Sequence, residues 1–434
     1  MRAVEAASRV LTHRVVRGAA ALAAARVVAV LCSLVIVSVM VRTFDAVEFG
    51  FWSVLASLTT LVVGLDFGIG NAARNRMAAL RAAGDEAGAA AHYGGTLLVL
   101  ALLALSVTVI AEVAMVGARR LGVIAWPADQ LGAAMIAAAC LGLFQTANLG
   151  VMALYAREES FTVAVLEMGR WVLMLAALLV AGLARASLVG ASAVYFGMLA
   201  FGSLMSLVVV ARVPSWRRRP PPPRIVVRMV KADVRAAGGF AALQGVAALV
   251  YQSDTLIASL LLPLERVGDY ALVLRLFSMP FSLLTSAIVP LWSRAAIEFA
   301  RGERAQVQQL ADRSARVALL LVGLAGASLV VLGPAFVQAW AGRAIDDLPL
   351  YLGFAAWLVV AGCVAVYSTV LNGMGRVRRQ TAFLALALAL KVVFASALVG
   401  RIGLSALAWG AAFALLPLAW SDRRELRRAL AGAT

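Results

Sequence analysis

Twelve runs of about 20 mostly apolar residues recur along the sequence, and they limit its fold more than any other feature. A helix of that length crosses about 30 Å of hydrocarbon. Hydrophobic residues make up 63% of the chain and charged residues 14%, and the mean hydropathy is +0.92. Because a backbone in lipid must satisfy its own hydrogen bonds, and because the runs lack the alternation of a membrane barrel, we expect helices. The predicted spans are residues 18–41, 49–71, 94–116, 131–153, 161–183, 187–210, 238–262, 268–291, 316–340, 348–371, 380–399 and 402–420.

The first run, Gly18 to Val41, follows a basic leader at residues 1–17, so a signal peptide is an alternative interpretation. The run is too long for the apolar core of a signal peptide, and its end at Val41-Arg42 offers no small-residue cleavage site. We interpret it as the first transmembrane helix.

The basic residues indicate the orientation of the chain. A net charge of +17 would suggest a nucleic-acid partner in a soluble protein, but in a membrane protein it is read loop by loop. With the N-terminus inside, 28 of the 39 Lys and Arg residues fall in cytoplasmic segments and 7 in outer loops. Cytoplasmic loops carry such an excess, so both termini are predicted to be cytoplasmic, in a bacterial inner membrane, without nucleic acid as a partner.

This orientation predicts the result of cysteine labelling in intact cells. A cysteine introduced near Asp346, in a predicted outer loop, should react with a membrane-impermeant maleimide added outside. A cysteine near Arg218, in the largest predicted cytoplasmic segment, should react only after the cells are opened. The reverse pattern would overturn the orientation.

The largest cytoplasmic segment, residues 211–237, divides the chain into lobes at residues 18–210 and 238–420, with a tail at residues 421–434. It contains three arginines after Trp216 and then Pro220 to Pro223, which favour a stiff polyproline II spacer. Beyond the prolines, Arg228, Lys231 and Arg235 alternate with apolar residues, a pattern typical of a helix lying on anionic lipids of the inner leaflet. A simple topology anchor is the alternative.

The two lobes show traces of an internal repeat. At an offset of 218 residues, Gly50 matches Gly268 and Arg76 matches Arg294, each at the same point relative to a span. Each lobe has an even number of spans, so the repeat is parallel. The sequence therefore predicts an all-α polytopic membrane protein with twelve transmembrane helices in two parallel-repeat six-helix lobes.

Cysteine and histidine provide no catalytic or metal-binding pattern. Cys32, Cys140 and Cys363 lie singly inside apolar runs, and His13 and His92 are isolated from each other. A metal site or a catalytic triad needs several such groups at suitable spacing. We therefore expect neither an enzyme nor a cofactor.

Ionisable residues inside the spans are the candidate site residues, because each costs about 2.5–3.5 kcal/mol at a helix centre. Glu167 and Arg170 lie on one helical face and are expected to pair, as are Arg26 with Asp66 and Asp254 with Arg275. These pairings would leave Lys391 as the one in-span charge without a partner. Arg170 and Lys391 lie at similar positions in the two lobes and could line a central cleft. The full set is Arg26, Asp66, Glu167, Arg170, Asp254, Arg275 and Lys391.

Several segments resemble the polysaccharide-biosynthesis flippases, the O-antigen and lipid-linked oligosaccharide translocases of the multidrug/oligosaccharidyl-lipid/polysaccharide exporter superfamily. The resemblance covers nearly the whole chain and rests on short motifs rather than on one diagnostic signature. These motifs are Glu48-Phe49-Gly50-Phe51-Trp52, Leu65-Asp66-Phe67-Gly68-Ile69-Gly70, Val267-Gly268-Asp269-Tyr270, Pro290-Leu291-Trp292-Ser293-Arg294 and Asn372-Gly373-Met374-Gly375-Arg376.

The resemblance implies a substrate in which a glycan is joined through a diphosphate to a polyprenyl chain. Cationic side chains suit the diphosphate, so Arg26, Arg170, Arg275 and Lys391 are its candidate ligands. The implied mechanism is alternating access between two lobes, and a glycan polymerase or glycosyltransferases could be partners.

Other functions stay open at this stage. Asp66, Glu167 or Asp254 could couple transport to a proton or to sodium, and no nucleotide-binding motif supports direct ATP drive. A multidrug or cation antiporter of the same superfamily would share the duplicated plan. A glycan polymerase usually carries a large outer loop, and the longest predicted outer connection here is only residues 117–130.

Overall fold

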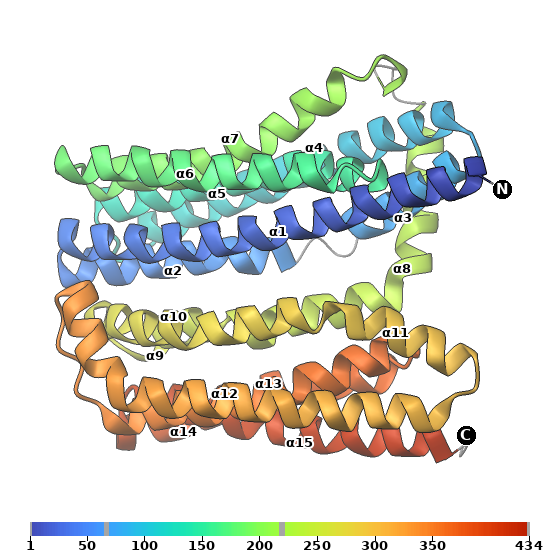
Figure 1. Ribbon diagram of the computed structural model, residues 1–434. Coiled ribbons are helices and arrows are strands. Elements are labelled where there is room, and N and C mark those ends of the chain that lie inside the picture. Colours follow the sequence, from blue (N-terminus) through green and yellow to red (C-terminus); the bar gives the residue numbers. More distant parts are fainter. Residues whose placement is uncertain (1, 65–68, 217–221, 432–434) are drawn as a thin grey trace. The chain divides into compact units, whose positions relative to one another are not determined.

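The computed structural model describes residues 2–64, 69–216 and 222–431, and every regular element in these ranges is helical (Figure 1). The first half holds α1 (Arg2–Thr43), α2 (Ala46–Gly64), α3 (Ile69–Ala82), α4 (Glu86–Arg120), α5 (Ala128–Ala156), α6 (Ser160–Leu183), α7 (Leu188–Ala211) and the 3₁₀-helix η1 (Pro214–Trp216). The second half holds α8 (Pro223–Gln252), α9 (Asp254–Leu261), α10 (Leu264–Ala287), α11 (Val289–Ala300), α12 (Arg304–Ala341), α13 (Leu348–Gly373), α14 (Arg378–Ile402) and α15 (Ser405–Ala431).

The helices confirm an all-α polytopic membrane protein. Within the described residues, nine segments are long and apolar enough to cross a membrane, and each coincides with a predicted span. The other three predicted spans correspond to α2, to α8 with α9, and to α15. Part of the second predicted span, residues 65–68, lies outside the described residues. The predicted interfacial helix is continuous with the seventh predicted span, because α8 extends from Pro223 to Gln252.

The chain divides into two compact units. The first contains residues 1–44 and 65–241, and the second contains residues 45–64 and 242–434. The boundary near residue 241 lies just after the predicted linker. The second unit also contains α2, which the sequence analysis placed in the N-terminal lobe.

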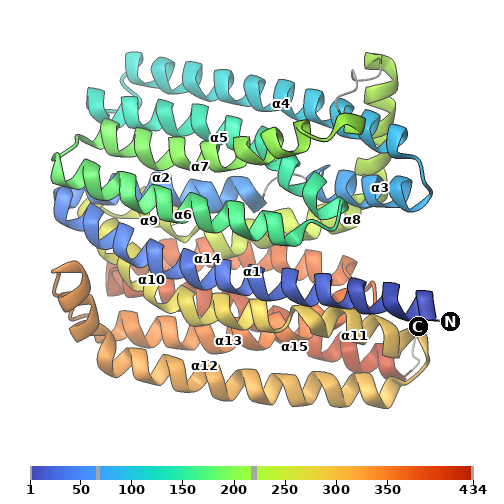
Figure 2. The same cartoon turned by 45° about the horizontal axis from the view of Figure 1, so that its top comes forward.

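In the first unit, α1 packs against α6, and α5 packs against both α4 and α7 (Figure 2). Small residues on α5 permit this close packing: a Cβ at Gly150 would clash with Ser206 of α7. One end of the unit contains a buried cluster that includes Met77, Tyr93 and Trp216. These side chains come from α3, α4 and η1, so the cluster fixes the beginning of the predicted linker at residues 211–237.

In the second unit, α2 packs along α10, and α13 packs against α12 and α15. Glycine explains the contact between α2 and α10: a Cβ at Gly50 would clash with the carbonyl oxygen of Leu264, and one at Gly268 would lie 2.8 Å from the Phe49 ring. The core behind this contact is aromatic, with ring centroids of Tyr270 and Phe354 5.2 Å apart. The two glycines that the repeat matched therefore lie at the same helix crossing.

Candidate functional site

A break between two helices places an acidic side chain inside the second unit. The helix α8 ends at Gln252 and α9 begins at Asp254, with buried Ser253 between them. The last carbonyl groups of a helix lack partners within it. One of them, that of Val250, accepts a hydrogen bond from the ammonium group of Lys391 on α14. The break thus places a backbone acceptor and a carboxylate where both contact one cation.

Lys391 and Asp254 form an ion pair at this helix break. Their Nζ and Oδ2 atoms are 2.8 Å apart, and each side chain is only 3% exposed. The expectation that Lys391 lacks a partner is therefore wrong. The expectation that Arg275 is the counter-ion of Asp254 is also wrong, since that counter-ion is Lys391. Arg275 is half-buried on α10. The ammonium reaches Asp254 because the helix break presents both the carboxylate and the Val250 carbonyl to α14.

The pair retains an unused acceptor. Oδ1 of Asp254 is buried and has no hydrogen-bond partner within the described residues, and the same holds for the Tyr270 hydroxyl. Tyr270 is fully buried, and its hydroxyl lies near enough to the Asp254 carboxylate to act on it as a hydrogen-bonding neighbour, although the geometry falls short of a regular hydrogen bond. Buried polar atoms are normally hydrogen-bonded, so exceptions mark strained or functional positions. The carboxylate can therefore accept a proton or an ion on Oδ1 without breaking a regular hydrogen bond there, by displacing at most the contact with the Tyr270 hydroxyl.

In the first unit, Glu167 and Arg170 form the predicted pair on α6. Oε1 and Nη2 are 3.3 Å apart, across an i to i+3 spacing, which confirms that expectation. The Arg170 stem packs on Gly202 of α7, where a Cβ would clash with it. Its Nε is buried and unpartnered within the described chain, so one donor of the guanidinium is unused.

The third predicted pair was Arg26 with Asp66. Arg26 is exposed on α1, and Asp66 lies outside the described residues, so their predicted pairing is not tested. Arg170 belongs to the first unit and Lys391 to the second, and a shared cleft between them stays a prediction. No group of three or more metal-binding side chains is found in the described ranges.

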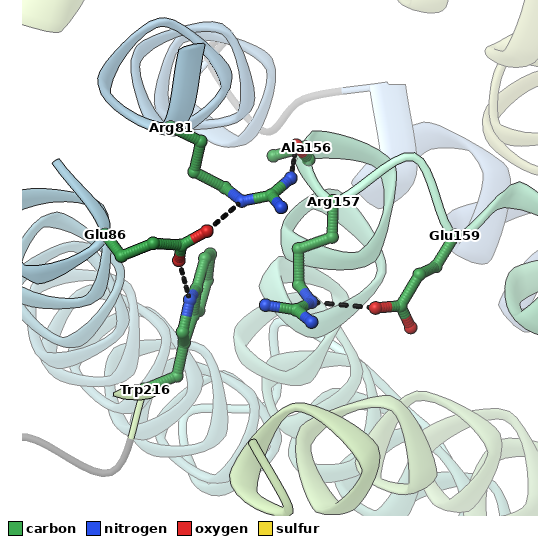
Figure 3. A network of polar contacts seen from close by, with 6 residues as sticks. All are labelled: Arg81, Glu86, Ala156, Arg157, Glu159 and Trp216. Carbon is green, nitrogen blue, oxygen red and sulfur yellow. Dashed lines mark hydrogen bonds and ion pairs between the residues drawn. The ribbon is translucent and has the colours of Figure 1, made fainter. Parts of the chain in front are cut away.

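Sequence reasoning missed a polar network at the end of the first unit (Figure 3). Glu86, at the start of α4, accepts from Nε of Arg81 at 2.8 Å and from the indole nitrogen of Trp216 at 2.9 Å. A second nitrogen of Arg81 donates to the carbonyl of Ala156, at 2.8 Å. The network connects the ends of α3, α4 and α5 to Trp216, near the beginning of the predicted linker.

A second pair closes this network (Figure 3). Nε of Arg157 lies 2.8 Å from Oε1 of Glu159, and its guanidinium lies 5.4 Å from the centroid of the Trp216 ring. Tyr93 packs on the same indole, with centroids 5.4 Å apart. The one signal in the sequence was a tryptophan directly before a run of arginines, which we interpreted as part of the linker and not as an anchor.

Comparison with solved structures identifies the fold. The chain is similar to a multidrug resistance MATE family transporter of the MOP superfamily in an inward-facing conformation, with a TM-score of 0.76 and 14% identity over 93% of this chain and 95% of that one. It is also similar to a single-residue mutant of the Vibrio cholerae MATE transporter VcmN, with a TM-score of 0.67 and 15% identity over 98% of both chains.

A third similar structure is a MOP superfamily transporter from Pyrococcus furiosus, whose binding pocket is described as having reverse polarity that suggests a different function. Its TM-score is 0.62, at 12% identity over 96% of both chains. No protein-family model and no curated protein matches the sequence. At these identities the likeness shows the fold, which is that of the MATE transporters.

Proposed function

We propose that this protein is an ion-coupled membrane transporter that exports organic cations and drugs by alternating access. The observation that carries the proposal is the buried ion pair of Lys391 and Asp254, with its unused carboxylate oxygen. Three transporters, two of them MATE proteins, share the fold over at least 93% of this chain. Nothing in the proposal requires chemical change of the substrate.

The ion pair supports coupling because uptake of one proton changes its energy. A charge buried in a protein is costly unless it is paired. A proton on Asp254 would neutralise the carboxylate and leave the Lys391 ammonium with the Val250 carbonyl as its acceptor. Conformations in which the ammonium reaches water or another anion would then be favoured. An ion that binds two conformations with different affinity shifts their equilibrium.

The pair also bears on the substrate. As a pair, Lys391 and Asp254 carry no net charge, so Lys391 does not present a free cation to a diphosphate. Arg170 is likewise paired with Glu167. These pairs argue against Lys391 as the main ligand of a lipid-linked glycan. They favour an organic cation, which could replace Lys391 as the partner of Asp254.

A second candidate is the flippase for lipid-linked glycans that the sequence motifs suggest. One observation favours it: the unpartnered Nε of Arg170, which can donate to a phosphate oxygen. The Pyrococcus furiosus protein is an example in which a pocket of reverse polarity was taken to suggest a different function on this fold.

Transport assays in a deletion strain separate the two candidates. The deletion should raise accumulation of a fluorescent lipophilic cation and leave surface glycan unchanged. The double variant Asp254→Asn with Lys391→Met should fail to restore efflux, at least tenfold below wild type, because it cannot exchange an ion at this position. As a control, Glu265→Gln on the exposed start of α10 should restore efflux fully.

The contrary result is equally clear. If the deletion strain keeps normal dye efflux, loses surface glycan and accumulates lipid-linked precursor on the inner leaflet, the protein is a glycan flippase. If the double variant restores efflux to the wild-type level, the ion pair is structural and does not couple transport.

A further inference from the structure

A second buried carboxylate lies at the end of the second unit. The sequence analysis placed residues 421–434 in a tail, but α15 continues through Ala431, and Asp422 is only 1% exposed. It lies beyond the predicted span 402–420, at the end predicted to face the cytoplasm. A buried carboxylate is costly unless it is neutralised or well hydrogen-bonded. The groups around Asp422 therefore show which of these applies.

Two neutral side chains contact the Asp422 carboxylate. The Ser368 hydroxyl on α13 donates to Oδ2 at 2.6 Å, and the amide of Gln380 on α14 lies near enough to act on the carboxylate as a hydrogen-bond donor. Gln380 is itself only 3% exposed. The carboxylate thus joins three helices, and no cation is among the groups that stabilise its charge within the described residues.

The nearby charges do not neutralise Asp422. Glu425, one turn further along α15, acts on it as a like charge. Two arginines pair with Glu425 and not with Asp422. Nη1 of Arg376 lies 3.0 Å from Oε1 of Glu425, and Nη1 of Arg379 lies 3.2 Å from its Oε2. Tyr251 of α8 also lies within electrostatic reach of Asp422.

The remaining ionisable groups of the neighbouring helices act on one another. Arg423, the next residue of α15, acts on Cys363 and Tyr367 of α13, and Asp312 of α12 also acts on Tyr367. Burial and the like charge of Glu425 therefore prevail over the two hydrogen bonds, and burial raises the pKa of Asp422 from its usual 3.8 to about 7.

A spare acceptor lies beside the carboxylate. Oε1 of Gln380 is buried without a hydrogen-bond partner in the described structure. An ionised carboxylate only accepts hydrogen bonds, whereas a protonated one also donates. If Asp422 takes a proton from water and the Gln380 amide turns over, the new O–H group donates to Oε1. Protonation thus satisfies the Oε1 acceptor in exchange for the amide N–H contact, so the buried carboxyl loses its charge while keeping a hydrogen-bonding partner in Gln380.

We propose that Asp422, Ser368 and Gln380 form a proton-binding site, separate from the pair of Asp254 and Lys391, which takes up one proton from the cytoplasmic side and tightens the contact of α13, α14 and α15. The ligand is the proton itself, held as an O–H bond on the Asp422 carboxyl. The site does not depend on the identity of the exported substrate.

Infrared titration of the purified full-length protein in detergent tests the site directly. As the pH is raised, a carboxylic-acid C=O band should disappear with a midpoint near pH 7 in the wild type. The same band should be missing in Asp422→Asn. Glu425→Gln, on the same helix and held by two arginines, should keep the band. The proposal would be refuted by a band that persists in Asp422→Asn, or by a wild-type band whose titration midpoint lies below pH 5. A midpoint that moves with sodium concentration would contradict the proton as the ligand.

Ser368→Ala keeps the test meaningful if Asp422→Asn folds poorly. It removes a hydrogen bond that stabilises the ionised form, so the midpoint should rise by about one pH unit. An unchanged or lower midpoint would count against the site.

Melting temperature gives an independent readout. Folded Asp422 holds its proton up to a higher pH than the unfolded chain, so its contribution to stability should be lost as the pH rises from 3.8 to about 7. Asp422→Asn should flatten that slope.

Discussion

Replacing Lys391 alone by Met should destabilise the protein by about 3–5 kcal/mol, because the change leaves the Asp254 carboxylate buried without its cation. The two side chains are only 3% exposed, so water cannot take the place of the ammonium. A free cation in a cleft, as the sequence suggested for Lys391, would have left folding largely intact on substitution. The measurement is the melting temperature and the yield of monodisperse protein in detergent.

The double variant and a matched control identify the cause. Asp254→Asn with Lys391→Met removes both charges and should recover most of the lost stability, since paired apolar or neutral replacements of a buried ion pair are often tolerated. Arg170→Met removes the cation of the other in-span pair. Glu167 is 36% exposed, against 3% for Asp254, so its charge can be relieved more easily and this loss should be smaller than that of Lys391→Met. Equal losses for Lys391→Met and Arg170→Met, or a double variant worse than either single one, would contradict the burial argument.

The outcome for these two pairs shows what a sequence can predict about buried charge. Glu167 and Arg170 lie three residues apart on one helix, so helical geometry alone predicts their contact. Asp254 and Lys391 are far apart in the chain, and their contact depends on which helices are neighbours. The sequence predicted a pair of Asp254 with Arg275, which lies on the next long helix, α10. Instead, the break before α9 and the packing of α9 against α14 bring Lys391 to Asp254.

Span positions followed from hydropathy because each span must bury its backbone polar groups within itself, whatever its neighbours. The function of a span end did not follow in the same way. Asp422 follows the last apolar run and was interpreted as tail, since the sequence does not show that α13 and α14 extend far enough to cover it. Trp216 was interpreted as linker for the same reason, because its partners Glu86 and Arg157 lie on other helices.

Gly50 and Gly268 show the opposite case, in which the sequence identified the residues but not their contact. The repeat matched them, and the structure places them at the crossing of α2 and α10. Arg343 reinforces the crossing, since its guanidinium lies 5.5 Å from the centroid of the Phe49 ring and 3.2 Å from Asp269. Residues 45–64, which include α2, are preceded and followed in the chain by residues of the first unit, so packing on α10 and not sequence neighbourhood holds α2 in the second unit.

Gly50→Ala should therefore weaken the crossing of α2 and α10 and favour conformations in which the two helices are apart. The new Cβ would overlap the backbone carbonyl of Leu264, which cannot turn aside as a flexible side chain could. Overpacking of this kind costs about 1–3 kcal/mol. Each 1.4 kcal/mol is a factor of ten in an equilibrium, so the separated state should gain about fivefold to a hundredfold in population.

The measurement is maleimide labelling of Val267→Cys, which is fully buried at this crossing, in a background with Cys32, Cys140 and Cys363 replaced by Ala. Labelling should accelerate at least about fivefold with Gly50→Ala, because the thiol reacts when α2 and α10 separate. Gly323→Ala, on α12 with open space around its Cβ, should leave the rate unchanged. If Gly50→Ala leaves labelling and transport at the wild-type level, the close approach of the two helices is not a constraint on the transport cycle. If it slows labelling, the contact tolerates the added methyl group and the steric argument for the crossing is wrong.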